Sequence, residues 1–356
     1  MKKLLAILCI LDTIFYAFAA RAAENQLLSP EWWPTATPEM VENAIHNGAD
    51  VKERNEDGCT PLMCAASNNQ NPKVIETLIR NGADVRARSK NGGTPLMYAA
   101  RNNQNSEIIE TLIKHGANVK ERDNDGWTPL MYAASNNPEI IETLIRNGAN
   151  VKERSERGST PLMLAASNTQ NPEIIETLIK HGADVKERGE RGSTPLMRAA
   201  SGNEYPEIIE TLIKHGADVK ERDNDGLTPL MWAADKTQNP KVIETLIHNG
   251  ADIKERDNSG ATPLIWAAEF NENPEIIEIL IRNGADIKTR DNDGMTPLMC
   301  AADSNQNPKV IETLIRNGAD IKARDNHGKT VLDYAKENPH IYRTKAYWLL
   351  NDKMYE

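Results

Sequence analysis

The fold of this chain is decided by the stretch Gly58-Cys-Thr-Pro-Leu-Met-Cys-Ala-Ala66, because close copies of it recur along most of the sequence. Thr-Pro-Leu occurs eight times, with its threonine at Thr60, Thr94, Thr128, Thr160, Thr194, Thr228, Thr262 and Thr296. The interval is 34 residues throughout, except for one interval of 32 that follows Thr128. A fixed period of this size is typical of stacked supersecondary units, so the sequence predicts a repeat protein with a long surface.

Each copy predicts two short helices. In the first copy, Thr60 is a suitable N-cap and is followed by a proline, which the first helical turn accepts. A second helix is expected to begin near Asn71 and to end at Gly82 in the left-handed conformation. The apolar residues between them form one stripe, and Glu76 and Thr77 are expected to face away from it. An extended arm follows, which is expected to turn near an Asn-Asp-Gly sequence.

The pattern Gly-x-Thr-Pro-Leu-x-x-Ala-Ala, followed by an apolar helix and Gly-Ala-Asp-Val, resembles the ankyrin repeat. The resemblance covers the chain from Thr37 to Ala335. It implies an all-α repeat solenoid of about eight full repeats, each a helix-turn-helix with an extended hairpin arm. The chain departs from the family pattern after Thr-Pro-Leu, where the usual His is Met in seven copies and Ile265 in one.

The ends of such a stack must be covered, so terminal capping units are expected. The predicted organisation is a capping unit at residues 24–54, a repeat array at 55–327 and a second capping unit at 328–356. Trp32, Trp33 and Trp348 are expected to pack in these caps, and a closing helix is expected near residues 341–350.

Residues 1–23 have the features of a secretory signal peptide. Two lysines precede an apolar run, and small residues near position 20 offer cleavage sites. Cleavage is therefore expected within residues 19–23, with a periplasmic or secreted product that does not insert into a membrane. The product would keep Cys59, Cys64 and Cys300, which are expected to be buried thiols with no disulfide, although their redox state stays open.

The charge pattern argues against nucleic acid as a partner. The net charge is −10 at neutral pH, whereas nucleic-acid binding normally needs a concentrated basic face. Lys-Glu-Arg triplets recur in the arms, for example at residues 52–54 and 120–122. They are interpreted as a charged ladder that protects exposed edges, and an anion-binding stripe is the alternative.

No catalytic constellation is recognisable, so an enzyme is not expected. Five of the seven histidines stand just before helix-ending glycines, where a basic group complements the helix dipole. No metal site and no cofactor are predicted, because neighbouring histidines would stand about one repeat apart.

The resemblance implies that a protein partner binds at the arm tips and at the concave face of the first helices. The matching positions vary among copies: the residue after the arm glycine, the residue before Ala-Ala and the residue after it. The predicted protein-binding residues are Tyr98, Trp127, Tyr132, Arg198, Leu227, Trp232, Asp235, Trp266, Glu269, Met295 and Asp303.

These observations favour an exported, monomeric scaffold that binds another protein through its concave face and has no catalysis of its own. The acidic residues beside the aromatic ones suggest a basic partner. Two alternatives stay open: a secreted effector that engages a host protein, and a catalytic role that would need a polar cluster.

Overall fold

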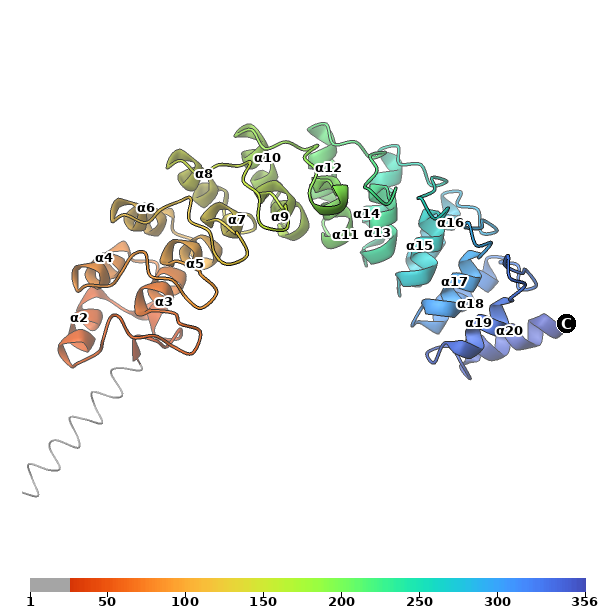
Figure 1. Cartoon of the computed structure of the whole chain (residues 1–356), viewed down its shortest axis with the longest axis horizontal. Helices are drawn as coiled ribbons and strands as arrows, with labels where there is room; N and C mark the ends of the chain where they lie inside the picture. Colours follow the sequence, from red (N-terminus) through yellow and green to blue (C-terminus); the bar gives the residue numbers. More distant parts are fainter. Residues whose placement is uncertain (1–25) are drawn as a thin grey trace, which may run out of the picture. The chain divides into compact units, whose positions relative to one another are not determined.

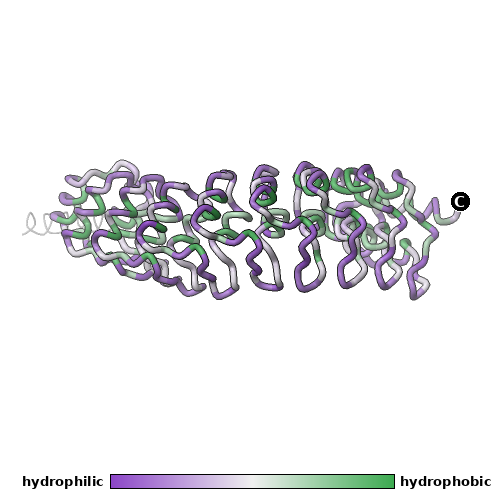
Figure 2. The backbone as a smooth tube through the Cα atoms, turned by 90° about the horizontal axis from the view of Figure 1, so that it is seen from above, coloured by the Kyte–Doolittle hydropathy of each residue, from purple (hydrophilic) through white to green (hydrophobic). Residues whose placement is uncertain are grey.

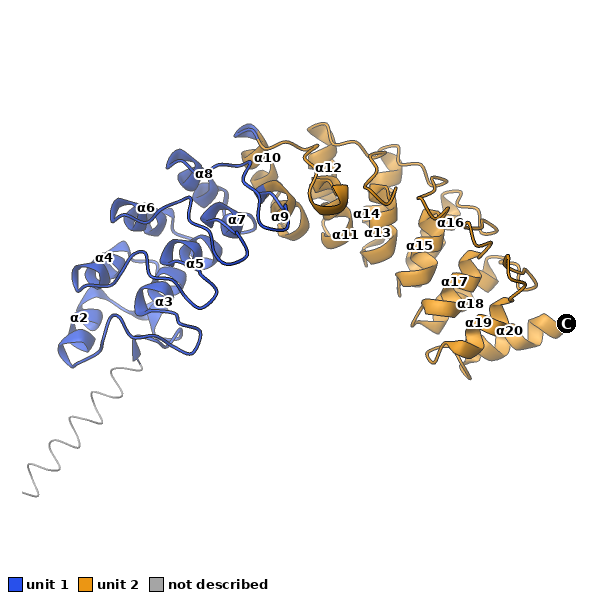
Figure 3. Cartoon of the chain, viewed as in Figure 1, with its two compact units in different colours: residues 1–161, 180–182 blue, residues 162–179, 183–356 orange. Residues whose placement is uncertain are grey.

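The structure is a computed structural model that describes residues 26–356, so the predicted signal peptide lies outside the described residues. The chain forms two compact units, which Figure 3 distinguishes by colour. Unit 1 contains the described residues up to 161 together with residues 180–182, and unit 2 contains residues 162–179 and 183–356.

Unit 1 consists of short helices joined by turns (Figure 1). Its elements are the 3-10 helix η1 (Trp33–Thr35) and helices α2 (Pro38–His46), α3 (Pro61–Asn68), α4 (Pro72–Arg80), α5 (Pro95–Asn102), α6 (Ser106–Lys114), α7 (Pro129–Ala133) and α8 (Pro138–Arg146). We call the first helix of each repeat, which follows Thr-Pro, the inner helix, and the second the outer helix.

Unit 2 continues the same alternation. Apart from the terminal residues of its first two helices, it holds α9 (Pro161–Asn168), α10 (Pro172–Lys180), η2 (Glu190–Gly192), α11 (Pro195–Gly202), α12 (Pro206–Lys214), α13 (Pro229–Lys236), α14 (Pro240–His248), α15 (Pro263–Phe270), α16 (Pro274–Arg282), α17 (Pro297–Ser304), α18 (Pro308–Arg316), α19 (Val331–Glu337) and α20 (Lys345–Tyr355). Residues 26–356 contain no β-strand, which confirms the predicted all-α solenoid.

The predicted local signals act as expected. The Thr60 hydroxyl accepts a hydrogen bond from the Met63 amide at 3.4 Å, and the Asn71 side chain accepts one from the Lys73 amide at 3.0 Å. Gly82 ends α4 with a φ of +93°, which a side chain would make unfavourable. The arm turns where expected, and in the first copy the Gly58 amide donates to the Asn55 carbonyl oxygen at 2.9 Å and the Asn55 amide to that of Cys59 at 3.1 Å.

One expectation for the outer helix was wrong. Glu76 is exposed, but Thr77 is only 1% exposed. The reason is that an outer helix packs against outer helices on both sides as well as against its own inner helix, as α4 does with α2, α6 and α3. Its buried arc is therefore wider than the single stripe of an amphipathic surface helix.

Buried asparagines tie successive repeats together. Asn103, at the end of α5, donates from its side-chain amide to the carbonyl oxygens of Ala66 and Asn69, both at 2.8 Å. Asn136 makes the equivalent pair of bonds although its repeat is two residues shorter. Four other asparagines make such a pair of bonds to the preceding unit: Asn69, Asn203, Asn271 and Asn305. Asn338 makes one bond of this kind, to the Asn305 carbonyl oxygen at 2.9 Å.

The arginines of the Lys-Glu-Arg triplets also serve the stack. The Arg54 guanidinium donates to the carbonyl oxygens of Gly58 and Arg88 at 2.7 Å, and Arg122 bonds to Gly126 and Arg154 in the same way. Figure 2 shows hydrophilic residues at the tips of the arms, whereas the hydrophobic residues lie mostly among the helices. The bonding of these arginines favours the structural interpretation over an anion-binding stripe.

The two ends differ in how they use tryptophan. Trp33 is fully buried, and its indole nitrogen donates to the Leu27 carbonyl oxygen at 3.1 Å. Trp348 is 53% exposed, and its ring lies 5.2 Å from that of Tyr347, so it packs in the C-terminal cap with only part of its surface. Its helix, α20, begins at Lys345 and packs on α18 and α19 through the buried Ala346, Tyr347 and Leu350. None of the helices within residues 26–356 has the length and apolar character that crossing a membrane requires.

Candidate functional site

The variable positions gather where the arms meet the inner helices, and we call this surface the inner-helix face of each unit. Most predicted site residues there are partly buried, and Asp303 is exposed. Cys59, Cys64 and Cys300 lie at the same positions and are buried free thiols, as expected. Burial raises the pKa of the Cys64 thiol to about 11, so this thiol is poorly reactive at neutral pH.

Buried aspartates in the arms fix the aromatic residues of the inner helices. The Trp232 indole nitrogen donates to an oxygen of Asp223 at 2.9 Å, and Trp266 makes the same bond to Asp257. The other oxygen of Asp223 accepts backbone N–H bonds within the arm turn, including one from Leu227 at 2.8 Å. One aspartate side chain thus stabilises the arm turn and also orients the indole ring of the inner helix.

In unit 2, two rings meet on the inner-helix face, and Trp232 holds the position of Trp266 in the preceding repeat. Trp266 lies 5.3 Å from Phe270, measured between ring centroids, and Phe270 is 44% exposed. Arg198 lies over Trp232 at 5.9 Å, and Lys236 lies over Phe270 at 6.0 Å. Cations therefore already occupy one side of two of these rings.

Sequence reasoning missed Phe270. It stands two residues after Ala-Ala, where most copies carry a small or polar residue such as Asn102 or Ser304. The unusual residue type could have identified Phe270 from the sequence. An exposed Phe at a position that is otherwise small or polar is unfavourable for a monomer unless it takes part in binding.

Carboxylates gather beside these rings. Burial raises the pKa of Glu269 to about 7, and the negative charges of Asp303, Asp291, Asp235 and Asp257 add to this shift. Asp235 forms an ion pair with the adjacent Lys236 at 3.0 Å. We call the set of Trp232, Trp266, Phe270, Asp235, Glu269 and Asp303 the acid-aromatic face.

Asp291 has a different setting from the other arm aspartates. The inner helix that follows it carries Cys300 at the position of the aromatic donor. Its carboxylate accepts backbone bonds from Asp293 and Met295, and burial raises its pKa. Trp266 and Met295 pack against a small apolar cluster that contains Cys300, so Met295 adjoins the acid-aromatic face. No contact places Leu227 in that cluster.

Unit 1 holds the other predicted aromatic residues. Trp127 and Tyr132 lie 5.3 Å apart, and the Tyr132 hydroxyl donates to Asp123 at 2.5 Å. The Tyr98 hydroxyl lies 2.9 Å from the Cys59 sulfur of the preceding arm. Arg101, which was not predicted as a site residue, is exposed at the end of α5.

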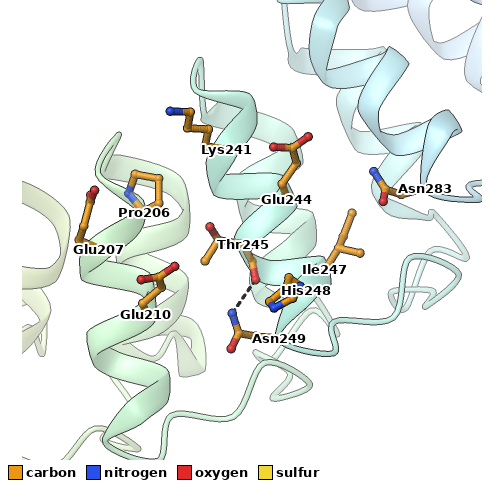
Figure 4. Close-up of a pocket in the computed structure, with 10 residues that line it drawn as sticks. All are labelled: Pro206, Glu207, Glu210, Lys241, Glu244, Thr245, Ile247, His248, Asn249 and Asn283. Carbon is orange, nitrogen blue, oxygen red and sulfur yellow. Dashed lines mark hydrogen bonds between the residues drawn. The ribbon is translucent and has the colours of Figure 1, made fainter.

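A groove of about 730 Å³ lies on the opposite, outer-helix side of unit 2 (Figure 4). Its walls come mainly from α12 and α14 and include Glu207, Glu210, Lys241, Glu244 and His248. The one hydrogen bond drawn in it runs from the Asn249 side chain to the Thr245 carbonyl oxygen, 2.8 Å long, and caps α14. No set of three or more His, Cys, Asp or Glu side chains in residues 26–356 could hold a metal ion.

Paired helices in register, with variable side chains on one face, define a repeat solenoid of the kind that serves as an interaction scaffold. The family model for ankyrin repeats (three copies) matches residues 35–123, 104–189, 162–257, 238–325 and 264–353. The chain therefore belongs to the ankyrin-repeat family, whose members are generally protein-interaction scaffolds and typically lack catalysis. No curated protein matches the chain significantly.

Proposed function

We propose that this chain is a non-catalytic, monomeric scaffold whose acid-aromatic face binds a basic, partly apolar segment of another protein. The observation that supports this most strongly is the pair of rings Trp266 and Phe270 beside Glu269, whose carboxylate is influenced by the charges of Asp235 and Asp303 on neighbouring inner helices. Aromatic residues are favoured anchors of interfaces, because they bury a large area for a small loss of side-chain entropy.

The rings are fixed before any partner arrives. The bonds from Trp232 to Asp223 and from Trp266 to Asp257 hold each indole in one orientation. A ring that is already ordered loses less conformational entropy on binding, which favours affinity. A lysine or arginine of the partner can stack on the faces that stay accessible, as Arg198 and Lys236 do within the chain.

The carboxylates give the face its preference for cations. Glu269, Asp235 and Asp303 repel one another, which is part of why the pKa of Glu269 is raised. A cationic segment would relieve that repulsion. Association is therefore expected to weaken as salt rises, because mobile ions screen such interactions.

A peptide selection tests this proposal even though the partner is unidentified. Random dodecapeptides displayed on phage would be selected on the full chain and, in parallel, on the Trp232→Ala, Trp266→Ala protein. We expect peptides that combine Lys or Arg with aromatic or aliphatic residues to be enriched on the first protein alone. Equal enrichment of such peptides on both proteins would refute the assignment of this face.

Export is a separate part of the proposal and rests on the sequence of residues 1–23. We expect cleavage within residues 19–23 and secretion of the mature chain to the periplasm or beyond. N-terminal sequencing of protein recovered from the periplasm and the medium checks this. Export would be contradicted by recovery of the chain only from the cytoplasm, with Met1 intact.

A further inference from the structure

We propose that unit 1 carries a second binding site, which takes a small aliphatic side chain next to a carboxylate on a partner peptide. The site is a small cavity of about 70 Å³ between an arm and the inner helices α5 and α7. We call it the Gly93 pocket, and its lining includes Ser89, Gly93, Met97, Tyr98, Arg101 and Tyr132. This inference shares with the proposed function only the premise that the chain binds peptide segments. It concerns unit 1 and not unit 2, other residues, and an acidic and not a basic partner segment.

The pocket exists because this copy departs from its neighbours at two positions. Gly93 follows the arm glycine, where the other seven copies carry a side chain. A Cβ atom at Gly93 would lie 3.1 Å from a ring carbon of Tyr98 and 3.2 Å from the Ser89 hydroxyl oxygen. The space beside the Tyr98 ring therefore stays open here.

The second departure is in the arm. Ser89 stands where the next arm has Asp123, the residue that holds Tyr132. Tyr98 has no carboxylate in its own arm to bond to, and its hydroxyl lies next to Cys59 instead. The ring of Tyr98 therefore forms a wall of the pocket.

The size and lining select a small apolar group. The Met97 side chain and the rings of Tyr98 and Tyr132 supply apolar surface, and the Ser89 hydroxyl is engaged by the Gly93 amide at 3.1 Å. A cavity of this volume accepts a side chain the size of alanine or valine and excludes an aromatic ring.

Arg101 supplies the preference for a carboxylate. It is exposed in the last turn of α5, and it forms no ion pair with any carboxylate of residues 26–356. The equivalent positions in the two neighbouring repeats hold Ser67 and Ser135, so no acid competes for it along this row. A guanidinium with free donors binds a carboxylate through two parallel hydrogen bonds.

The test uses substitutions that sister repeats already contain. Gly93→Ser copies Ser159 and Ser193 and closes the pocket, while Arg101→Ser copies Ser67 and Ser135 and removes the charge. Lys114→Ser, on the outer helix α6, removes the same charge elsewhere and serves as the control. All variants are made in the Trp232→Ala, Trp266→Ala protein, so that the acid-aromatic face does not contribute.

Random dodecapeptides displayed on phage are the probe. We expect enriched peptides to place Ala or Val beside Asp or Glu, and the synthetic peptide to bind Gly93→Ser and Arg101→Ser at least tenfold more weakly. Binding to Lys114→Ser should be unchanged. Thermal denaturation establishes that each variant is folded, and Arg101→Ser alone decides the matter if Gly93→Ser does not fold.

Two results would overturn the assignment. One is a lack of enriched peptides with this pairing, and the other is a peptide that binds both serine variants as tightly as the parent. Basic peptides that are enriched only when both tryptophans are present report on the acid-aromatic face. The experiment can therefore refute the proposal for one site without refuting the proposal for the other.

Discussion

Substitution of both tryptophans, Trp232→Ala with Trp266→Ala, is expected to weaken binding of a selected basic peptide by at least about 100-fold. An interface anchor contributes roughly 2 kcal/mol or more, and each 1.4 kcal/mol is a factor of ten in affinity. Loss of two anchors on one face should therefore lower the affinity for the peptide by about two to three factors of ten. Fluorescence anisotropy with the labelled peptide measures this change.

The design must separate lost contacts from altered packing. Each Trp→Ala change also leaves a buried arm aspartate without its indole donor, which costs stability of about 1–3 kcal/mol. A second variant avoids this cost by combining Asp223→Ser with Trp232→Leu and Asp257→Ser with Trp266→Leu. These pairs reproduce Ser155 and Leu164, which occupy the same positions in another repeat.

Trp348→Ala is the matched control. It removes an exposed tryptophan of α20 and is expected to leave peptide affinity within about twofold, because a side chain outside the contact contributes little. If the leucine variant binds the peptide as tightly as the parent, the rings are structural only.

Glu269→Gln is expected to raise stability and to reduce binding at the same time. The pKa of Glu269 is about 7 in the folded chain and near its ordinary value of 4.5 when unfolded. The folded state therefore holds the proton more tightly, so ionisation of Glu269 costs stability increasingly from about pH 4.5 to pH 7. Above pH 7 the cost is complete, on the order of 1–3 kcal/mol.

Glutamine does not ionise, so the variant does not carry the cost of a buried negative charge. It should therefore be more stable than the parent at pH 8 and about as stable as the parent at pH 4.5. For binding of the basic peptide, the parent should have the advantage over the variant at high pH. The parent should bind more tightly as pH rises through about 7, whereas the variant should lack that step. Urea denaturation and peptide titration at the same pH values measure both effects.

Glu244→Gln is the control for charge, because Glu244 belongs to the outer helix α14 and lines the groove on that side. It should change neither the pH profile of stability nor that of binding. A Glu269→Gln protein that keeps the binding step near pH 7 would show that another group controls it.

The sequence was sufficient to predict the repeat fold because its local signals agree with one another. Thr60 and Asn71 each cap the start of a helix, and Gly82 follows the end of one. The same three signals recur at a fixed spacing along the chain. Burial of Thr77 was not predictable from one helix, because the neighbouring outer helices cause it.

The candidate site was predictable only in part. Variation among copies identified Trp232 and Trp266, since packing alone would favour one residue type at that position. Their bonds to Asp223 and Asp257 depend on how the arm folds back, over a separation of nine residues. The pKa of Glu269 is raised by burial and then by carboxylates from several repeats, and no single repeat contains that information.

The central claim is that a basic segment lies on the acid-aromatic face, and crosslinking tests it most directly. A selected basic peptide with one photoreactive benzophenone residue would be crosslinked to the full chain, and the joined residues identified by mass spectrometry. We expect crosslinks to α13, α15 and α17 and to the arms that precede them. Crosslinks confined to α12, α14 and α16, around the outer groove, would contradict the claim.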